Sequence, residues 1–163
     1  MKPRGIRRSI PVLACVAVLM IFISFPARAA ERKPVAVKKG DKCAVCGMFV
    51  EKYKEWMAQV IFTDGTAAFF DGPKDMFRYY LNVPRYTPAR KQSDIEVMYV
   101  TEYYSARMMN VKDVFFVQGS DVYGPMGTEL VPVETEARAK EFLKDHKGKK
   151  ILGFGGVTSE DVR

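Results

Sequence analysis

Residues 56–81 read WMAQVIFTDGTAAFFDGPKDMFRYYL, a pattern that predicts a β-hairpin followed by a helix. Asp64-Gly65 is a strong two-residue turn signal, and it separates an apolar strand at 56–62 from a returning strand at 66–70. Pro73 suits the first turn of a helix, where its missing N–H would have no partner anyway. Four apolar residues share one face of that helix: Met76, Phe77, Tyr80 and Leu81.

The order strand, strand, helix, strand occurs twice along the chain. A strand at 95–103 completes the first series. The second series comprises strands at 113–118 and 128–133, a Gly-rich connection at 119–127, a helix at 135–147 and a strand at 149–154. An internal repeat of one supersecondary unit explains both series. We therefore predict an α+β domain at 43–156 made of two tandem ββαβ-type units, 43–103 and 108–156. The units should pack together, because each alone would leave a sheet face bare.

Residues 1–29 have the pattern of a secretory signal peptide. A basic segment precedes the apolar run 10–25, and Ala27-Arg28-Ala29 is a small-x-small cleavage site. We expect a cleaved, periplasmic protein rather than one with an uncleaved anchor or membrane tether. Cys15 follows a lipobox-like dipeptide, but most of the apolar run lies after it, so we expect it to be removed with the signal.

The segments on either side of the predicted domain are polar. Residues 30–42 are rich in charge and predict a linker, and residues 157–163 predict a frayed tail. The chain of 163 residues has 26 Lys+Arg and 19 Asp+Glu, a net charge of +7. Five of these basic residues and no acidic ones lie in the signal, which leaves 21 basic and 19 acidic residues, or +2. This near-neutral charge argues against a nucleic-acid partner.

Two cysteines remain after cleavage, and they form the cluster Cys43-Ala44-Val45-Cys46-Gly47-Met48. A structural zinc site needs four ligands, usually Cys or His, and one chain cannot complete such a set. Haem attachment needs a histidine after the second cysteine, where this chain has Gly47. Redox chemistry and a structural disulfide remain open. Cu(I) binding is favoured, because Cu(I) prefers thiolate and thioether donors and accepts few of them.

Two methionines are the best candidates to join the cysteines. Met48 lies two residues after Cys46, so in an extended segment the two side chains share a face. Met126 lies in Gly124-Pro125-Met126-Gly127, where flanking glycines allow a close approach of the backbone. We therefore predict a Cu(I) site formed by Cys43, Cys46, Met48 and Met126, with Met126 contributed by the second unit.

The remaining polar residues do not predict an enzyme. His146 is the only histidine, and its position near a helix C-terminus favours a capping or core role. Without a second histidine there is no Ser-His-Asp set. Asp64, Asp71 and Asp75 are explained by the predicted turn and helix start, so we expect no carboxylate pair with a chemical role.

The Cys-x-x-Cys-Gly-Met motif after an export signal resembles the NosL family. The run GPMGTELVPV at 124–133, followed by a helix and a short strand, is similar to that family too. The resemblance implies a pair of ββαβ units and a periplasmic Cu(I)-binding accessory protein of nitrous oxide reductase, active in denitrification. It also implies Cys46, Met48 and Met126 as the leading ligands. The sequence departs from the family in lacking a typical lipoprotein signal and a histidine near these motifs.

These observations favour an exported, non-enzymatic metallochaperone that delivers Cu(I) by ligand exchange. Its partner would be a periplasmic copper enzyme or the machinery that assembles a copper site, with nitrous oxide reductase as the client that the resemblance implies. Two alternatives remain. One is a thiol–disulfide oxidoreductase that uses Cys43 and Cys46, and the other is an interaction protein in which the same pair forms a structural disulfide.

Overall fold

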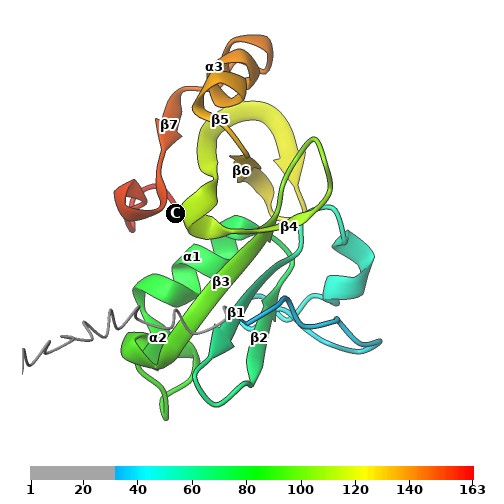
Figure 1. Cartoon of the computed structure of the whole chain (residues 1–163), viewed down its shortest axis with the longest axis vertical. Coiled ribbons are helices and arrows are strands. Elements are labelled where there is room, and N and C mark those ends of the chain that lie inside the picture. The colour runs from blue at the N-terminus through cyan, green and yellow to red at the C-terminus, as the bar shows by residue number, and fades with distance from the viewer. Residues whose placement is uncertain (1–31) are drawn as a thin grey trace, which may run out of the picture. The chain divides into compact units, whose positions relative to one another are not determined.

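The computed structural model describes residues 32–163 (Figure 1). The predicted signal peptide at 1–29 lies outside the described residues. The chain divides into two units, residues 1–30 and 31–163, and every helix and strand described below belongs to the second. Within residues 32–163, no helix has both the length and the apolar character to cross a membrane.

The first series of elements forms a four-stranded antiparallel sheet in the order β2-β1-β3-β4. Its elements are β1 (Ala58–Phe62), β2 (Ala67–Phe70), α1 (Pro73–Leu81), β3 (Ile95–Thr101) and β4 (Met108–Asn110). Shorter helical turns lie at Val50–Tyr53, Val83–Tyr86 (α2) and Gln92–Asp94. As predicted, Asp64-Gly65 lies in the tight turn between β1 and β2, and Gly65 has a positive φ of 84° that suits such a turn.

The second series forms a three-stranded antiparallel sheet in the order β6-β5-β7. Its elements are β5 (Phe115–Gly124), β6 (Gly127–Val133), α3 (Glu136–Asp145) and β7 (Lys150–Leu152), with short turns of helix at Val111–Asp113 and Phe154–Gly156. In both sheets the first strand of the series lies between the second strand and the strand after the helix. This shared topology confirms the α+β fold of two ββαβ-type units.

Helix α1 lies between the two sheets, and α3 covers the far face of the second sheet (Figure 1). On α1, Phe77 packs edge-on against Phe116 of β5, with ring centroids 4.9 Å apart. Alternate residues of the second sheet face opposite helices. Phe116, Leu130 and Leu152 join the core around α1, whereas Val117, Val131 and Ile151 pack with α3. The second sheet is therefore buried on both faces, and α1 is a shared core element of the two units.

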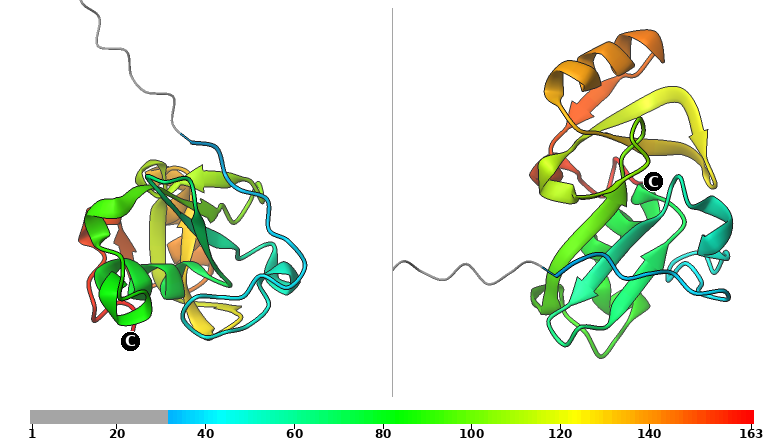
Figure 2. Two further views of the ribbon diagram at one scale, coloured as in Figure 1. Left: turned by 90° about the horizontal axis from the view of Figure 1, so that it is seen from below. Right: turned by 45° about the vertical axis from the view of Figure 1, so that its right-hand side comes forward.

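Residues 32–42 are not a free linker. The side-chain amide of Gln59 on β1 accepts a hydrogen bond from the Val35 N–H (2.7 Å) and donates one to the Val35 carbonyl (3.2 Å). Val35 also packs on an apolar cluster that contains Ile61 and Val97. This segment crosses the outer face of the first sheet, as Figure 2 shows. It packs there because that face carries apolar side chains, which would otherwise be exposed to water.

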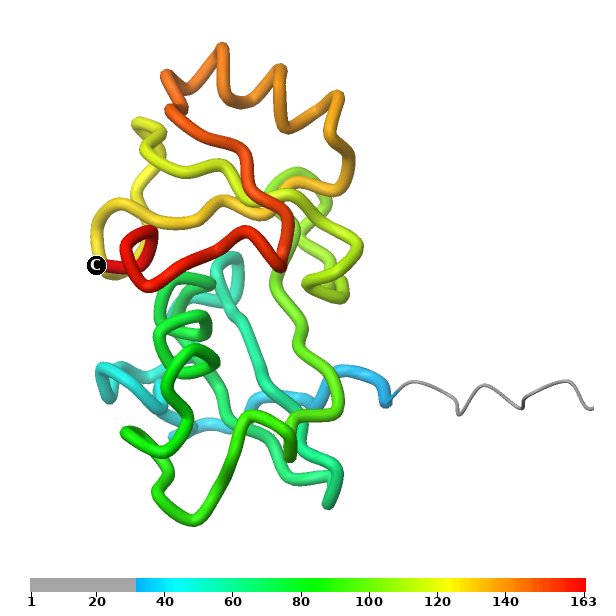
Figure 3. The backbone as a smooth tube through the Cα atoms, turned by 90° about the vertical axis from the view of Figure 1, so that its left-hand side faces the viewer, coloured from blue at the N-terminus to red at the C-terminus, as the bar shows by residue number. Residues whose placement is uncertain are grey.

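The C-terminal residues 157–163 are packed rather than frayed. Val157 and Val162 are both buried, and the Arg78 guanidinium on α1 donates a hydrogen bond to the Val162 carbonyl. Lys150 and Asp161 form an ion pair at 2.9 Å. In Figure 3 this segment returns to lie beside α1. Two buried valines provide the apolar contacts that a frayed tail would lack.

Two boundaries within the domain also differ from the prediction. Residues 108–110 form β4 and pair with β3, so they belong to the first sheet and not to the second unit. The Gly-rich stretch 119–127 is mostly strand, because β5 continues to Gly124 and leaves a two-residue turn before β6. A register shift between Gln118 and Tyr123 makes this possible, and Gly119 there has a φ of +75°.

Candidate metal centre

The Cys-x-x-Cys segment forms a closed turn that is fixed to the first sheet. The Cys43 N–H donates to the Met48 carbonyl at 2.8 Å, and the Gly47 N–H donates to the Cys43 carbonyl at 3.0 Å. Gly47 has a φ of +78°, a conformation that favours glycine. The Ala44 N–H donates to the Phe69 carbonyl on β2 at 3.0 Å. The backbone therefore holds both cysteines beside the C-terminal end of β2.

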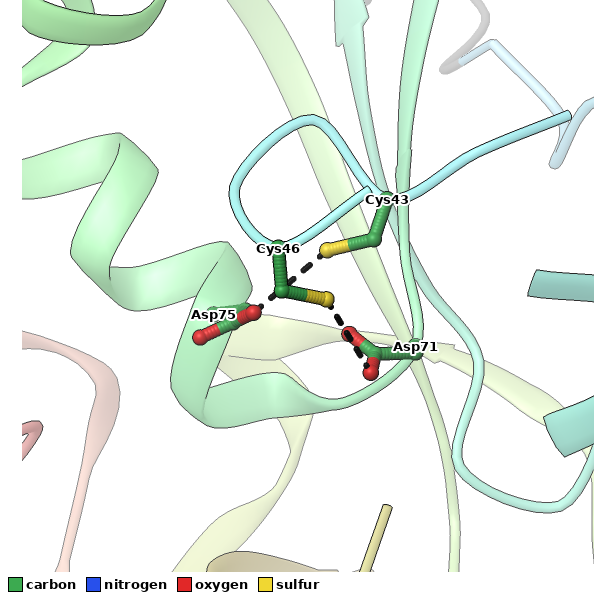
Figure 4. Close-up of side chains that lie close together, drawn as sticks. All are labelled: Cys43, Cys46, Asp71 and Asp75. Carbon is green, nitrogen blue, oxygen red and sulfur yellow. Dashed lines mark hydrogen bonds between the residues drawn. The ribbon is translucent and has the colours of Figure 1, made fainter. Parts of the chain in front are cut away.

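Two aspartates approach the cysteines from the junction of β2 and α1. Asp71 follows the last residue of β2, and Asp75 lies in the first turn of α1. The Cys43 Sγ lies 3.4 Å from the Asp75 Oδ2, and the Cys46 Sγ lies 3.4 Å from the Asp71 Oδ2. One donor atom from each of the four residues lies within 4.8 Å of the other three. Figure 4 shows the four side chains converging on one point. We call these residues the Cys/Asp cluster.

Burial controls the chemistry of the thiols. Cys43 is only 3% exposed, whereas Cys46 is half-buried and offers the more accessible sulfur. Burial raises the pKa of the Cys43 thiol far above its ordinary value, and it also raises the pKa of Cys46. Both thiols are therefore protonated near neutral pH and donate to the aspartates. A metal ion that binds them must displace their protons.

The two carboxylates are not equally compensated. Asp75 accepts a hydrogen bond from Arg78 at 2.8 Å and forms an ion pair with it. Asp71 is fully buried, and its Oδ1 atom has no hydrogen-bond partner among the described residues. Buried polar atoms of this kind are uncommon in native structures, so each calls for an explanation.

Glu129 holds the second unit against this end of α1. Its buried carboxylate accepts hydrogen bonds from the backbone N–H of Lys74, at 2.5 Å, and of Leu130, at 2.9 Å. The first of these bonds satisfies one of the free N–H groups at the start of α1. Burial raises the pKa of Glu129 to about 7, against the opposing effect of the two backbone hydrogen bonds. The motif 124–133 therefore includes a structural contact that positions the helix carrying Asp75.

The two methionines predicted as copper ligands lie in different parts of the fold. Met48 is half-buried in the same closed turn as the cysteines. Met126 lies in the β5–β6 turn, where its carbonyl accepts a hydrogen bond at 3.3 Å from Lys74, the residue before Asp75. The side chain of Met126 is 41% exposed. The Lys74 side chain thus links this turn to the first turn of α1, and the thioether ligands stay a prediction.

Asp71 and Asp75 lie in the cluster although the sequence pattern did not predict a chemical role for them. Each has a local explanation at a turn or helix start, which hid a second role. A carboxylate pair four residues apart, in the same chain as a Cys-x-x-Cys motif, is the signal that was present. His146 lies elsewhere, at the end of α3. Its ring stacks on that of Phe142, with centroids 4.3 Å apart, and its Nδ1 atom lies 3.2 Å from the Asp121 Oδ1.

The sequence of this chain matches the model of a known protein family. The family model described as NosL matches residues 34–162. The chain belongs to the NosL family. The NosL match begins within the segment that covers the first sheet and extends to Val162, so both predicted flanking segments belong to the domain.

Two solved NosL structures are similar to this chain. The crystal structure of the copper chaperone NosL from Shewanella denitrificans has a TM-score of 0.65 at 19% identity, and the match covers 78% of this chain and 97% of that one. The solution structure of the apo-NosL protein from Achromobacter cycloclastes has a TM-score of 0.46 at 22% identity and covers 64% and 87%. No curated protein sequence matches the chain. At these identities, the crystal structure supports the fold alone.

Proposed function

We propose that this NosL protein is an exported metallochaperone that binds Cu(I) and passes it on by ligand exchange. The observation that carries the proposal is the pair of free thiols, Cys43 and Cys46, held together in one closed turn with one of them accessible. The similar fold of the copper chaperone NosL from Shewanella denitrificans supports it. Thiolates are preferred donors for Cu(I), and carboxylates are not.

The unequal burial of the two thiols supports transfer as well as binding. Cys43 would anchor the ion from the core side, whereas the half-buried Cys46 would be the ligand that an incoming donor replaces first. The raised pKa values of both thiols favour release of the ion, because a proton can take its place on each sulfur. Met48 and Met126 are the proposed further donors from the two sides of the site.

Anaerobic titration with Cu(I) against a competing chelator tests the proposal. We expect one Cu(I) per chain, and Cys46→Ser should weaken binding by at least about 10-fold, the loss typical of damage to a metal site. Met126→Ala should weaken it as well, while Met109→Ala, on β4 of the first sheet, serves as the matched control. Unchanged affinity in Cys46→Ser would show that the ion binds elsewhere.

The client and the location belong to the same proposal. We propose that the protein works in the periplasm and supplies copper to an exported copper enzyme, with nitrous oxide reductase as the candidate. Cell fractionation tests the location. Mixing the Cu(I)-loaded protein with copper-free nitrous oxide reductase tests the client, and a failure to load that enzyme would point to another acceptor.

A thiol–disulfide oxidoreductase is less well supported by the same residues. Such an enzyme needs a cysteine with a lowered pKa, because the thiolate is the nucleophile. Burial instead raises the pKa of both Cys43 and Cys46. We expect slow reaction of the metal-free protein with a thiol-specific reagent at neutral pH, and fast reaction of either cysteine would revive the enzymatic alternative.

A further inference from the structure

A surface cavity of about 590 Å³ lies between α3 and the loop that joins β3 to β4. The second sheet separates α3 from α1, the helix that carries Asp75 (Figure 1). We call it the Tyr104 cavity, and it shares no residue with the Cys/Asp cluster. Its lining comes from the loop and from α3 with the residue that follows: Tyr104, Ser105, Arg138, Glu141, Asp145 and His146.

Hydrogen bonds fix the loop that carries Tyr104. The fully buried carboxylate of Glu102 accepts from the Ser105 N–H at 2.7 Å. The Tyr103 N–H donates to the Pro132 carbonyl on β6 at 2.9 Å, which ties the loop to the second sheet. The loop is therefore ordered before anything binds, and a partner loses little affinity in ordering it.

This loop presents two aromatic rings at the surface. Tyr103 is 36% exposed and Tyr104 is 48% exposed, and their rings meet edge-on with centroids 5.1 Å apart. Tyr103 in turn packs edge-on against Phe142 of α3, at 5.0 Å. Packed but exposed tyrosines are typical of the residues that contribute most to protein–protein binding.

The helix side of the cavity carries two uncompensated carboxylates. Glu141 and Asp145 are both exposed and lie four residues apart on α3, a spacing at which like charges repel. Asp145 is also the last residue of α3, where the helix dipole disfavours a negative charge. The ion pairs of this region within residues 32–163 involve other side chains. Burial raises the pKa of Tyr104, and the charges of Glu141 and Asp145 raise it further, so the potential at this ring is negative.

Arg138 supplies a positive charge to the same cavity. Its guanidinium carbon lies 5.8 Å from the centroid of the Tyr104 ring, a distance at which a cation is attracted to an aromatic face. His146 is directed instead toward Asp121, with 3.2 Å between Nδ1 and Oδ1. One guanidinium against two carboxylates leaves the lining with an excess of one negative charge.

We propose that the Tyr104 cavity is a docking site for an arginine side chain of a partner protein. A guanidinium group can stack on an aromatic ring and donate two parallel hydrogen bonds to a carboxylate. The cavity offers both, through Tyr104 and through Glu141 with Asp145. A positive charge there also relieves the repulsion between the two carboxylates, so the charge complementarity favours a basic occupant.

Docking at this position leaves the Cys/Asp cluster uncovered. A partner that holds α3 contacts the face of the second sheet opposite α1, so the half-buried Cys46 stays accessible to a separate donor or acceptor of the ion. The arginine site therefore provides attachment without taking part in metal binding, and it does not depend on the proposed copper chemistry.

NMR titration of the 15N-labelled, reduced, metal-free protein with N-acetyl-arginine amide tests the proposal. This probe carries the side-chain charge of arginine and has no charged ends. We expect saturable amide shifts at millimolar probe concentration, confined to residues 103–107 and 138–146. N-acetyl-citrulline amide has nearly the same shape without the charge and should bind at least about 3-fold more weakly. No saturable shift with the arginine probe, or equal binding of the citrulline probe, would overturn the proposal.

Variants assign the binding to the cavity. Tyr104→Ala and Glu141→Gln should each weaken binding of the arginine probe by at least about 3-fold. Glu136→Gln, an exposed glutamate at the start of the same helix, is the matched control and should bind it as the parent does. Unchanged binding in Tyr104→Ala and Glu141→Gln would place the probe elsewhere and refute the site. The Cu(I) affinity of Tyr104→Ala should equal that of the parent, so the arginine site and the copper site can fail separately.

Two further measurements distinguish the occupants. Free arginine carries a carboxylate that Arg138 could bind, so at least about 10-fold tighter binding of free arginine than of the blocked probe would indicate an amino-acid site and refute docking of a protein. Analytical ultracentrifugation at the NMR concentration should show a monomer. A dimer that the arginine probe dissociates would identify the occupant as a second copy of this chain and would overturn the proposal of a different partner.

Discussion

Replacing Glu129 by glutamine should remove a specific pH dependence of stability. Glu129 is 3% exposed, and burial raises its pKa from 4.5 to about 7. The native state therefore holds this proton more tightly than the unfolded chain does. The stability that the protonated carboxyl provides is complete below about pH 4.5 and is lost as the pH rises through about 7. Glutamine keeps the oxygen that accepts from Lys74 and Leu130 but cannot ionise.

The size of the effect follows from the two pKa values. A rise from 4.5 to about 7 corresponds to about 3 kcal/mol in the free energy of unfolding, at about 1.4 kcal/mol for each tenfold change in proton affinity. Urea denaturation of the metal-free, reduced protein at several pH values between 4 and 8 measures it. The stability of Glu129→Gln relative to the parent should increase by about 3 kcal/mol across that interval.

A matched control separates this effect from a general change in charge. Glu160→Gln alters an exposed glutamate near the C-terminus and should give a curve parallel to that of the parent. If Glu129→Gln also gave a parallel curve, then Glu129 would ionise as it does in the unfolded chain, and the inferred cost of burying its charge would be wrong.

Three further changes test the packing of the fold. Chemical denaturation measures the first and the last, and amide hydrogen exchange measures the second. Phe77→Ala should cost about 3–5 kcal/mol, because Phe77 is fully buried between the two sheets; Tyr123→Ala, at a side chain that is 68% exposed, should stay within about 0.5 kcal/mol of the parent. Gln59→Ala removes both hydrogen bonds to Val35 and should speed amide exchange there, and unchanged exchange would mean that apolar contacts alone hold that segment. Deleting residues 158–163 should cost about 1.5–3 kcal/mol through the loss of one buried valine, and an unaltered stability would contradict the packing of this segment.

Local signals in the sequence predicted the secondary structure well. The Asp64-Gly65 turn, the proline at the start of α1 and the apolar face of that helix all act within a few residues, so they need no tertiary information. The repeated order of elements then indicated the two units, and the structure confirms the repeat in the shared strand order of both sheets.

The ends of the domain could not be predicted in the same way. Residues 32–42 and 157–163 carry few apolar residues and no clear periodicity, which is typical of linkers and tails. Their packing depends on surfaces made by other parts of the chain: the outer face of the first sheet in one case and α1 in the other. A sequence pattern shows that a segment is polar, but it does not show that the segment packs against an apolar surface formed by distant residues.

The candidate site likewise combines residues that are close in the sequence with residues that only the fold brings together. Cys43 and Cys46 lie near each other because only two residues separate them in the sequence. The extended segment assumed between Cys46 and Met48 is instead a closed turn, in which Gly47 has a positive φ. Asp71 and Asp75 come to face these thiols only when the chain folds, because 25 and 32 residues separate the paired side chains in the sequence. They meet because the cysteine turn pairs with the end of β2, where Asp71 follows and α1 begins. Hydrogen bonds between backbone groups far apart in the chain thus bring two cysteines and two aspartates into one cluster.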